Sequence, residues 1–152
     1  MPDVRQPAQD ADQAQEVSTR EIYQMRAITL HQPYATLIAV GIKTIETRSW
    51  FCRPGELAIH AAKRIMGDDG LHIANVASRV HSFAMCYPRG AVLATCRIDE
   101  CIPTDVARDL YPEQIPWGNF DNGRWAWIIK DVKQLNPQVP CRGFQRFFEV
   151  EL

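Results

Sequence analysis

The hydrophobic positions of this 152-residue chain fall in short runs separated by turn-forming residues. Intervals of mainly two to four residues between apolar positions predict a helix over 68–83. Runs rich in β-branched and aromatic residues predict strands, over residues 27–31, 43–50, 56–62, 91–102, 124–132 and 144–152. Five or six short strands with two or three small helices, and no long strand–helix–strand unit, predict an α+β domain built on a small mixed β-barrel.

Single residues mark the ends of several predicted elements. Pro33 suits the first turn of a helix that ends before Gly41, where a left-handed cap is expected. Thr104 is expected to cap a second short helix that runs to Leu110. The stretch 112–117 is expected to be a loop. A turn before the last strand is predicted from three residues, Pro137, Pro140 and Gly143.

Residues 1–24 differ in composition from the rest of the chain. They are rich in Gln, Ala, Asp and Glu and contain few large aliphatic residues, so they predict a disordered or frayed-helical tail that precedes a domain over 25–152. Such a tail is a candidate binding segment for a protein partner. The start of the chain lacks the basic-then-apolar order of a secretory signal, and the longest apolar run, at 37–40, is too short to span a bilayer. A cytoplasmic protein without membrane contact is expected.

Charge limits the ligands that the domain is expected to bind. The net charge is −1, and beyond residue 20 the chain carries 15 basic and 14 acidic side chains. A broad track for duplex phosphates needs many more cations, so any nucleic-acid site must be a local patch for a small ligand or a short single strand. The five cysteines form no CxxC pair, which predicts reduced, mostly buried thiols and neither a metal site nor a cofactor.

The sharpest candidate group of charged residues is Lys43, Glu46 and Arg48, within the segment 41–48. Strand alternation places Glu46 and Arg48 on one face. As a ligand site, Arg48 offers a planar fork to phosphate or a base edge, Lys43 a point charge, and Glu46 an acceptor. The alternative is an ion pair that joins helix, turn and strand. The two interpretations are compatible.

The same residues are the candidates for catalysis. A desolvated Lys43 with a lowered pKa is suited to act as a base, with a water activated by Glu46. Cleavage of RNA needs a base and phosphate-binding cations, for which His60, Lys63 and Arg64 are candidates together with Lys43. A structural, hydrogen-bonded histidine is the alternative for His60.

Aromatic residues offer platforms on which an unstacked base can lie, flanked by arginines. The candidates are Tyr34, Trp50 and Trp117, with Arg48, Arg124 and Arg142 beside them. Trp125 and Trp127 lie two residues apart on one strand face and are expected in the core. Trp117, in a Pro- and Gly-containing stretch, is expected to be exposed. Gln32 is a candidate reader of a base edge or, alternatively, a helix cap.

The segments that surround these candidates resemble the activating signal cointegrator homology (ASCH) family. The resemblance covers about residues 26–152 and rests on Gln32-Pro33-Tyr34, on Gly41, Lys43, Glu46, Arg48 and Trp50, on residues 57–63, on residues 123–127 and on residues 140–143. Tyr34 stands where the family usually has tryptophan. The resemblance implies a PUA-like β-barrel with a helix after its first strand and a cleft edged by the GxKxxExR segment.

The family resemblance implies several functions. Related domains bind RNA, are reported to cleave RNA, or hydrolyse the amide of acetylated cytidine nucleosides. In that last group a threonine follows the lysine by three residues, whereas Glu46 stands there in this chain.

We therefore expect recognition of single-stranded RNA or a modified nucleoside. The expected cleft is formed by Gln32, Tyr34, Lys43, Glu46 and Arg48, with Lys63, Arg64 and Arg142 on its phosphate rim. The alternatives are a metal-independent hydrolase, acting on RNA or acylated nucleosides through Lys43 and Glu46, and a catalytically inert adaptor.

Overall fold

A computed structural model describes residues 21–82 and 85–152 of the chain. Most of the predicted tail, and the protein-binding role predicted for it, lies outside these residues. The elements are β1 (Gln24–Leu30), α1 (Tyr34–Ala39), β2 (Ile45–Arg48), β3 (Gly55–Ala61), α2 (Asp68–His81), β4 (Ala91–Pro103), α3 (Thr104–Leu110), the 3-10 helix η1 (Pro112–Trp117), β5 (Trp125–Pro140) and β6 (Phe147–Glu151).

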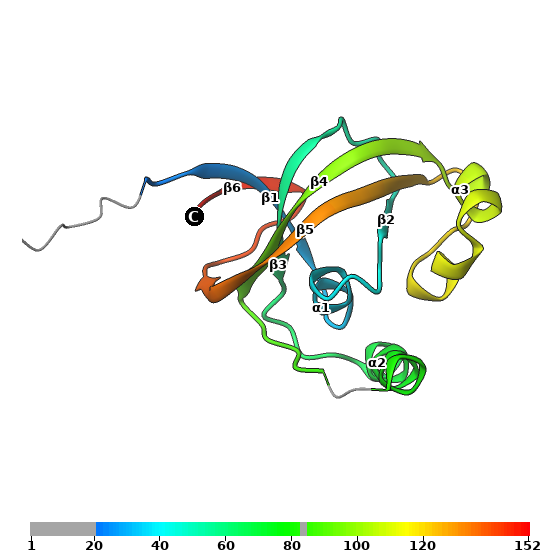
Figure 1. The fold of residues 1–152 in the computed structure, drawn as a ribbon, viewed down its shortest axis with the longest axis horizontal. Coiled ribbons are helices and arrows are strands. Elements are labelled where there is room, and N and C mark those ends of the chain that lie inside the picture. The colour runs from blue at the N-terminus through cyan, green and yellow to red at the C-terminus, as the bar shows by residue number, and fades with distance from the viewer. Residues whose placement is uncertain (1–20, 83–84) are drawn as a thin grey trace, which may run out of the picture.

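One mixed sheet organises the domain. Its strand order is β2-β5-β4-β3-β1-β6, in which β1 and β3 pair in parallel and the other neighbours pair antiparallel. The sheet curls into an open half-barrel, with α1 on its concave side and α3 at one end of the long strands (Figure 1). The predicted α+β class, with a barrel-like sheet and few helices, is confirmed. None of the helices in the described ranges has the length and apolarity to cross a membrane.

Burial of apolar residues between the curled sheet and α1 forms the main core. Ile38 from α1 and Ile59 from β3 are at most 1% exposed, and Trp127 from β5 is fully buried among them. The Trp127 ring stacks on that of Phe147 at 5.5 Å between centroids. The burial of Trp127 confirms its predicted place in the core.

Most elements lie near their predicted positions, and the differences have local causes. β1 begins at Gln24, before the predicted residue 27, because Gln24 pairs with Glu151 of β6. Thr104 is not the cap of α3, since its hydroxyl donates to the carbonyl of Asp121 at 2.6 Å and makes no capping bond. Residues 112–117 form η1 instead of a loop.

The turn predicted before the last strand is present between β5 and β6, where it includes Gly143, but it does not include Pro137. β5 continues through this proline to Pro140. Pairing with β4 passes from Gln134 opposite Ala94 to Val139 opposite Val92, which leaves the residues between them outside the ladder. A proline lacks the N–H that a paired position needs, so the interruption of pairing accommodates Pro137 within the strand.

Candidate functional site

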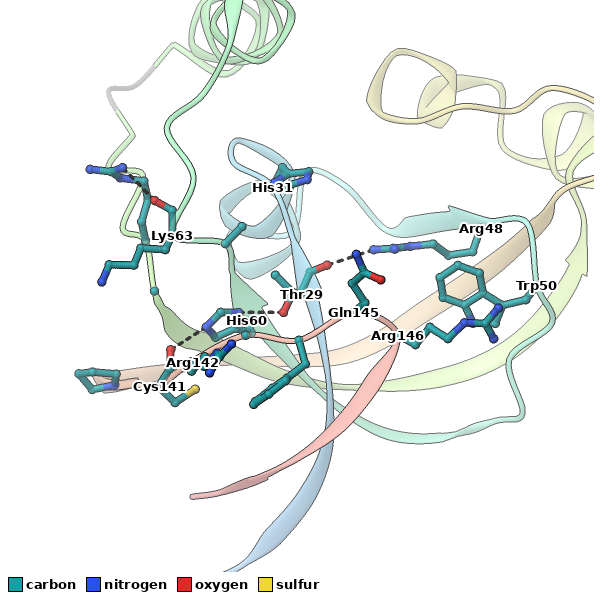
Figure 2. A pocket seen from close by; sticks show the side chains of 16 residues that line it. Thr29, His31, Arg48, Trp50, His60, Lys63, Cys141, Arg142, Gln145 and Arg146 are labelled. Atoms are coloured by element: carbon teal, nitrogen blue, oxygen red, sulfur yellow. Dashed lines mark hydrogen bonds between the residues drawn. The ribbon is translucent and has the colours of Figure 1, made fainter.

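One hollow in the described part of the structure is a cavity of about 1170 Å³. Its walls come from the ends of β1, β2 and β3 and from the segment 140–146, which joins β5 to β6 (Figure 2). Five basic side chains line it: Arg48, Lys63, Arg89, Arg142 and Arg146. None of the described residues that line the cavity carries a carboxylate. We call this space the cationic cavity.

Few of these cations are neutralised within the protein. Arg48 donates from Nε to Oε1 of Glu46 at 2.7 Å. Arg89 donates from Nη1 to the carbonyl of Lys63 at 3.0 Å, and a carbonyl brings no net charge. Of the five cations, Arg48 is therefore the one with a described carboxylate partner. Cations gathered in a concave site raise the local positive potential and attract anions.

His60 lies at the floor of the cavity and is 1% exposed. Its Nε2 is 3.0 Å from the carbonyl of Cys141, and its Nδ1 is 3.0 Å from Oγ1 of Thr29. A carbonyl only accepts, so Nε2 carries the proton and Nδ1 accepts from the Thr29 hydroxyl. Burial lowers the pKa of His60, against a smaller opposing effect of the Cys141 carbonyl. The neutral ring therefore tethers the segment 140–146 to the sheet.

Gly143 lies tightly against the sheet. A Cβ added at this position would lie 2.5 Å from Cε1 of His60 and 2.6 Å from Oγ1 of Thr29. Neither atom belongs to a long flexible side chain, so only glycine fits the observed backbone. The fit brings Arg142 and Arg146, on either side of Gly143, to the cavity wall.

Two aromatic rings support arginines of the cavity. The guanidinium carbons of Arg48 and Arg146 lie 5.2 and 5.3 Å from the centroid of the Trp50 ring. Arg142 lies 5.3 Å from the centroid of Phe144. Contact with an aromatic face orients a guanidinium without neutralising its charge, so these arginines remain able to bind an anion.

The predicted group Lys43, Glu46 and Arg48 forms a chain of ion pairs. Lys43 is 1% exposed, its Nζ lies 3.3 Å from Oε2 of Glu46, and it donates to the carbonyl of Trp117 at 2.6 Å. Burial lowers the pKa of Lys43, although Glu46 partly opposes this shift. Arg48 also donates to the Thr29 carbonyl at 3.2 Å. The ion-pair arrangement considered from the sequence is therefore present, and only Arg48 of the three lines the cavity.

Gln32, Tyr34 and Arg64 line a second hollow of about 540 Å³, which shares His31 with the cationic cavity. The Gln32 amide is fully engaged, because it donates to Oγ1 of Thr36 at 2.8 Å and to a carbonyl at 2.6 Å, and accepts from the Thr36 backbone at 3.0 Å. Gln32 therefore accepts from a backbone N–H at the start of α1. This is the capping role that the sequence offered as the alternative to reading a base edge.

Trp117 and Arg124 lie away from the cationic cavity. Trp117 is 6% exposed and packs with Leu37 and Ile42, so its predicted exposure is wrong. The reason is that η1 turns this residue inward, toward α1. Arg124 donates to the carbonyls of Asn119 and Thr47 at 3.2 and 3.1 Å and thereby holds a loop against β2.

The cavity thus gathers four of the predicted binding residues, Arg48, Trp50, Lys63 and Arg142. Sequence reasoning missed Arg89, Gln145 and Arg146 as cavity residues. The spacing of Arg142 and Arg146 around Gly143 and Phe144 is a signal in the sequence that points to a basic loop. Within the described ranges, no group of three or more His, Cys, Asp or Glu side chains is placed to hold a metal ion.

Comparisons with known proteins connect this chain to one family. The model of the ASCH domain matches residues 28–138. Activating signal cointegrator 1 of Homo sapiens and of Mus musculus is 22% identical over 130 residues, which is 82% of this chain and 22% of the length of those proteins. Among solved structures, ASCH from Zymomonas mobilis is 13% identical with a TM-score of 0.49, over 76% of this chain and 72% of that one. A tyrosine-to-phenylalanine variant of the Zymomonas protein gives a TM-score of 0.46 at 12% identity, over 76% and 74% of the two chains.

Proposed function

The chain belongs to the ASCH domain family, and from this premise we propose that it binds single-stranded RNA in the cationic cavity. One observation carries the proposal. Five basic side chains converge on a concave site in which no described lining residue is acidic, although the whole chain has a net charge of −1. Such a concentration of cations matches a ligand with several phosphates.

The shape of the site favours a single strand over a duplex. The cations line a hollow rather than a long convex or flat track, and a duplex presents its phosphates along a rigid rod. A single strand is flexible enough to place its phosphates and an unstacked base inside the cavity. The guanidinium planes of Arg48, Arg142 and Arg146, which lie over the rings of Trp50 and Phe144, provide planar surfaces for a base.

Hydrolysis of RNA or of an acylated nucleoside is the second candidate, and the lowered pKa of Lys43 favours it. The contacts of three side chains, Lys43, Glu46 and His60, weigh against it. The Lys43 amine is held by Glu46 and by the Trp117 carbonyl. Glu46 accepts from Arg48 as well. Both ring nitrogens of His60 are hydrogen-bonded within the protein. A base must have access to the proton that it removes, so binding is the function that the geometry supports better.

The proposal is tested by fluorescence anisotropy with a labelled RNA octamer, single-stranded or annealed to its complement, over a range of salt concentrations. We expect tighter binding of the single strand. Arg142→Gln and Arg146→Gln should each weaken binding and reduce the slope of log affinity against log salt, by about 0.7 for each phosphate that the variant no longer neutralises. Lys130→Gln and Lys133→Gln are matched controls, because both lysines are exposed on β5 outside the cavity.

Unchanged affinity and salt slope in both arginine variants would contradict the assignment of the cavity. Mass spectrometry of the same mixtures, with acylated nucleosides added, tests hydrolysis. A product that forms with the parent and disappears with Lys43→Met would favour the hydrolase over the binding module.

A further inference from the structure

The basic side chains of the cationic cavity lie toward two ends, with neutral groups between them. Figure 2 shows Lys63 and Arg142 on one side of Thr29, and Arg48 and Arg146 on the other. Arg89 belongs to the first end, because it bonds the Lys63 carbonyl. A ligand that uses both ends therefore carries at least two anionic groups. The volume of about 1170 Å³ exceeds the range of about 300–1,000 Å³ usual for small-molecule sites, so it has room for more than one nucleotide.

The middle of the cavity is suited to a hydroxyl group. Thr29, His60 and Gln145 lie there (Figure 2). The Thr29 hydroxyl donates its proton to Nδ1 of His60, which leaves its lone pairs as acceptors. The exposed Gln145 amide, with no described protein partner, supplies both a donor and an acceptor. These groups complement a hydroxyl that donates and accepts, whereas they bring no charge to a phosphate.

We propose that the cavity selects RNA over DNA by receiving a ribose 2′-hydroxyl at Thr29 and Gln145, between phosphates bound at its two cationic ends. The inference rests on the RNA binding proposed above. It adds the position at which the sugar is read and the smallest ligand, a ribose with a phosphate on each side. The 2′-hydroxyl is the group by which a protein distinguishes the two nucleic acids at a given site.

The test compares three fluorescent octamers of one sequence. These are RNA, the corresponding DNA with deoxyuridine in place of thymidine, and RNA with 2′-O-methyl groups. We expect RNA to bind about tenfold more tightly than DNA, as befits one or two net hydrogen bonds. The 2′-O-methyl strand keeps the ribose oxygen but cannot donate a hydrogen bond to Thr29, so it should bind less tightly than RNA.

Two variants locate the effect. Gln145→Ala and Thr29→Val should each bring the ratio of RNA to DNA affinity toward one. Gln145 is exposed, so Gln145→Ala is expected to fold. If Thr29→Val does not fold, Gln145→Ala decides the question alone. Gln138→Ala is the control, because Gln138 is exposed on β5 and lines a different hollow.

The outcomes separate the two proposals. Equal binding of RNA and DNA by the parent protein would overturn the sugar readout and leave single-strand binding intact. If Gln145→Ala retains the full preference for RNA, the proposed position of the 2′-hydroxyl is also overturned. If the parent binds none of the three octamers, the RNA-binding function and the sugar readout both fail.

Discussion

The Nε2–H group of His60 donates to the carbonyl of Cys141 across a distance of 3.0 Å. This bond joins β3 to the segment that carries Arg142 and Arg146, about eighty residues later in the chain. The Thr29 hydroxyl fixes the other side of the ring. The position of two cavity arginines thus depends on a neutral histidine buried beneath them.

Gly143→Ala should weaken RNA binding by displacing this segment. The new Cβ would lie 2.5 Å from the His60 ring, so the segment has to move outward with its arginines. Overpacking of this kind costs about 1–3 kcal/mol of stability. Gly67→Ala is the control, because a Cβ there meets no atom within 4 Å and φ is −79°. Urea unfolding and anisotropy measure the two effects, and parental RNA affinity in a folded Gly143→Ala protein would refute the proposed positioning.

Protonation of His60 should destabilise the fold in mild acid. Burial lowers the pKa of His60 below its usual value of 6.5, so between these two pKa values the unfolded chain binds more protons than the folded one. The free energy of unfolding therefore falls as the pH drops below about 6.5.

Urea unfolding at a series of pH values tests this effect, with His60→Gln as the variant that cannot titrate. The stability difference between the parent and His60→Gln should shrink as the pH falls. His72→Gln, on an exposed position of α2, controls for removal of a histidine. A difference that stays constant from pH 7.5 to 4.5 would refute the role of His60 in the acid response.

The five thiols should react in the order of their exposure. Cys86 is exposed, whereas Cys52 and Cys96 are buried. Burial raises the pKa of Cys96 to about 12, so it carries almost no thiolate at neutral pH. Alkylation with iodoacetamide, followed by peptide mass spectrometry, should label Cys86 first and Cys96 only after addition of denaturing urea. Equal labelling rates of Cys86 and Cys96 in the native protein would contradict the described burial.

Local patterns in the sequence predicted the elements more closely than the site. α1 begins just after Pro33 and ends just before Gly41, as the backbone preferences of these two residues predict. Gly41 has the positive φ of 83° that a left-handed cap needs. The alternation of Glu46 and Arg48 placed both on one strand face, and their side chains bond at 2.7 Å. These features depend on residues close together in the chain.

The cavity depends on contacts between distant segments, which local patterns do not encode. Nothing near Gly143 in the sequence indicates that its backbone lies against His60 and Thr29. Trp117 shows the same limit, because proline and glycine nearby indicated an exposed loop, while contacts with Leu37 and Ile42 bury the ring. The cysteines were expected to be mostly buried, yet only Cys52 and Cys96 are; Cys101 and Cys141 are half-buried and Cys86 is exposed.

The buried pair of Lys43 and Glu46 should respond unequally to loss of its two members. Glu46→Gln leaves the Lys43 ammonium buried beside the Trp117 carbonyl, without its carboxylate. Removal of one partner from a buried pair costs about 3–5 kcal/mol when the other charge is left uncompensated. Lys43→Met removes the charge that burial disfavours, and Glu46 keeps its bond to Arg48. We therefore expect a smaller loss from Lys43→Met than from Glu46→Gln.

Urea unfolding of both variants measures this asymmetry, with Glu100→Gln as an exposed carboxylate control. Equal losses of stability from Lys43→Met and Glu46→Gln would mean that the Lys43 ammonium is hydrated in solution and not buried. The Lys43→Met protein also tests the assignment of the binding site, because Lys43 does not line the cationic cavity. Folded Lys43→Met should bind RNA like the parent, and a large drop in affinity at unchanged stability would place Lys43 in the binding site after all.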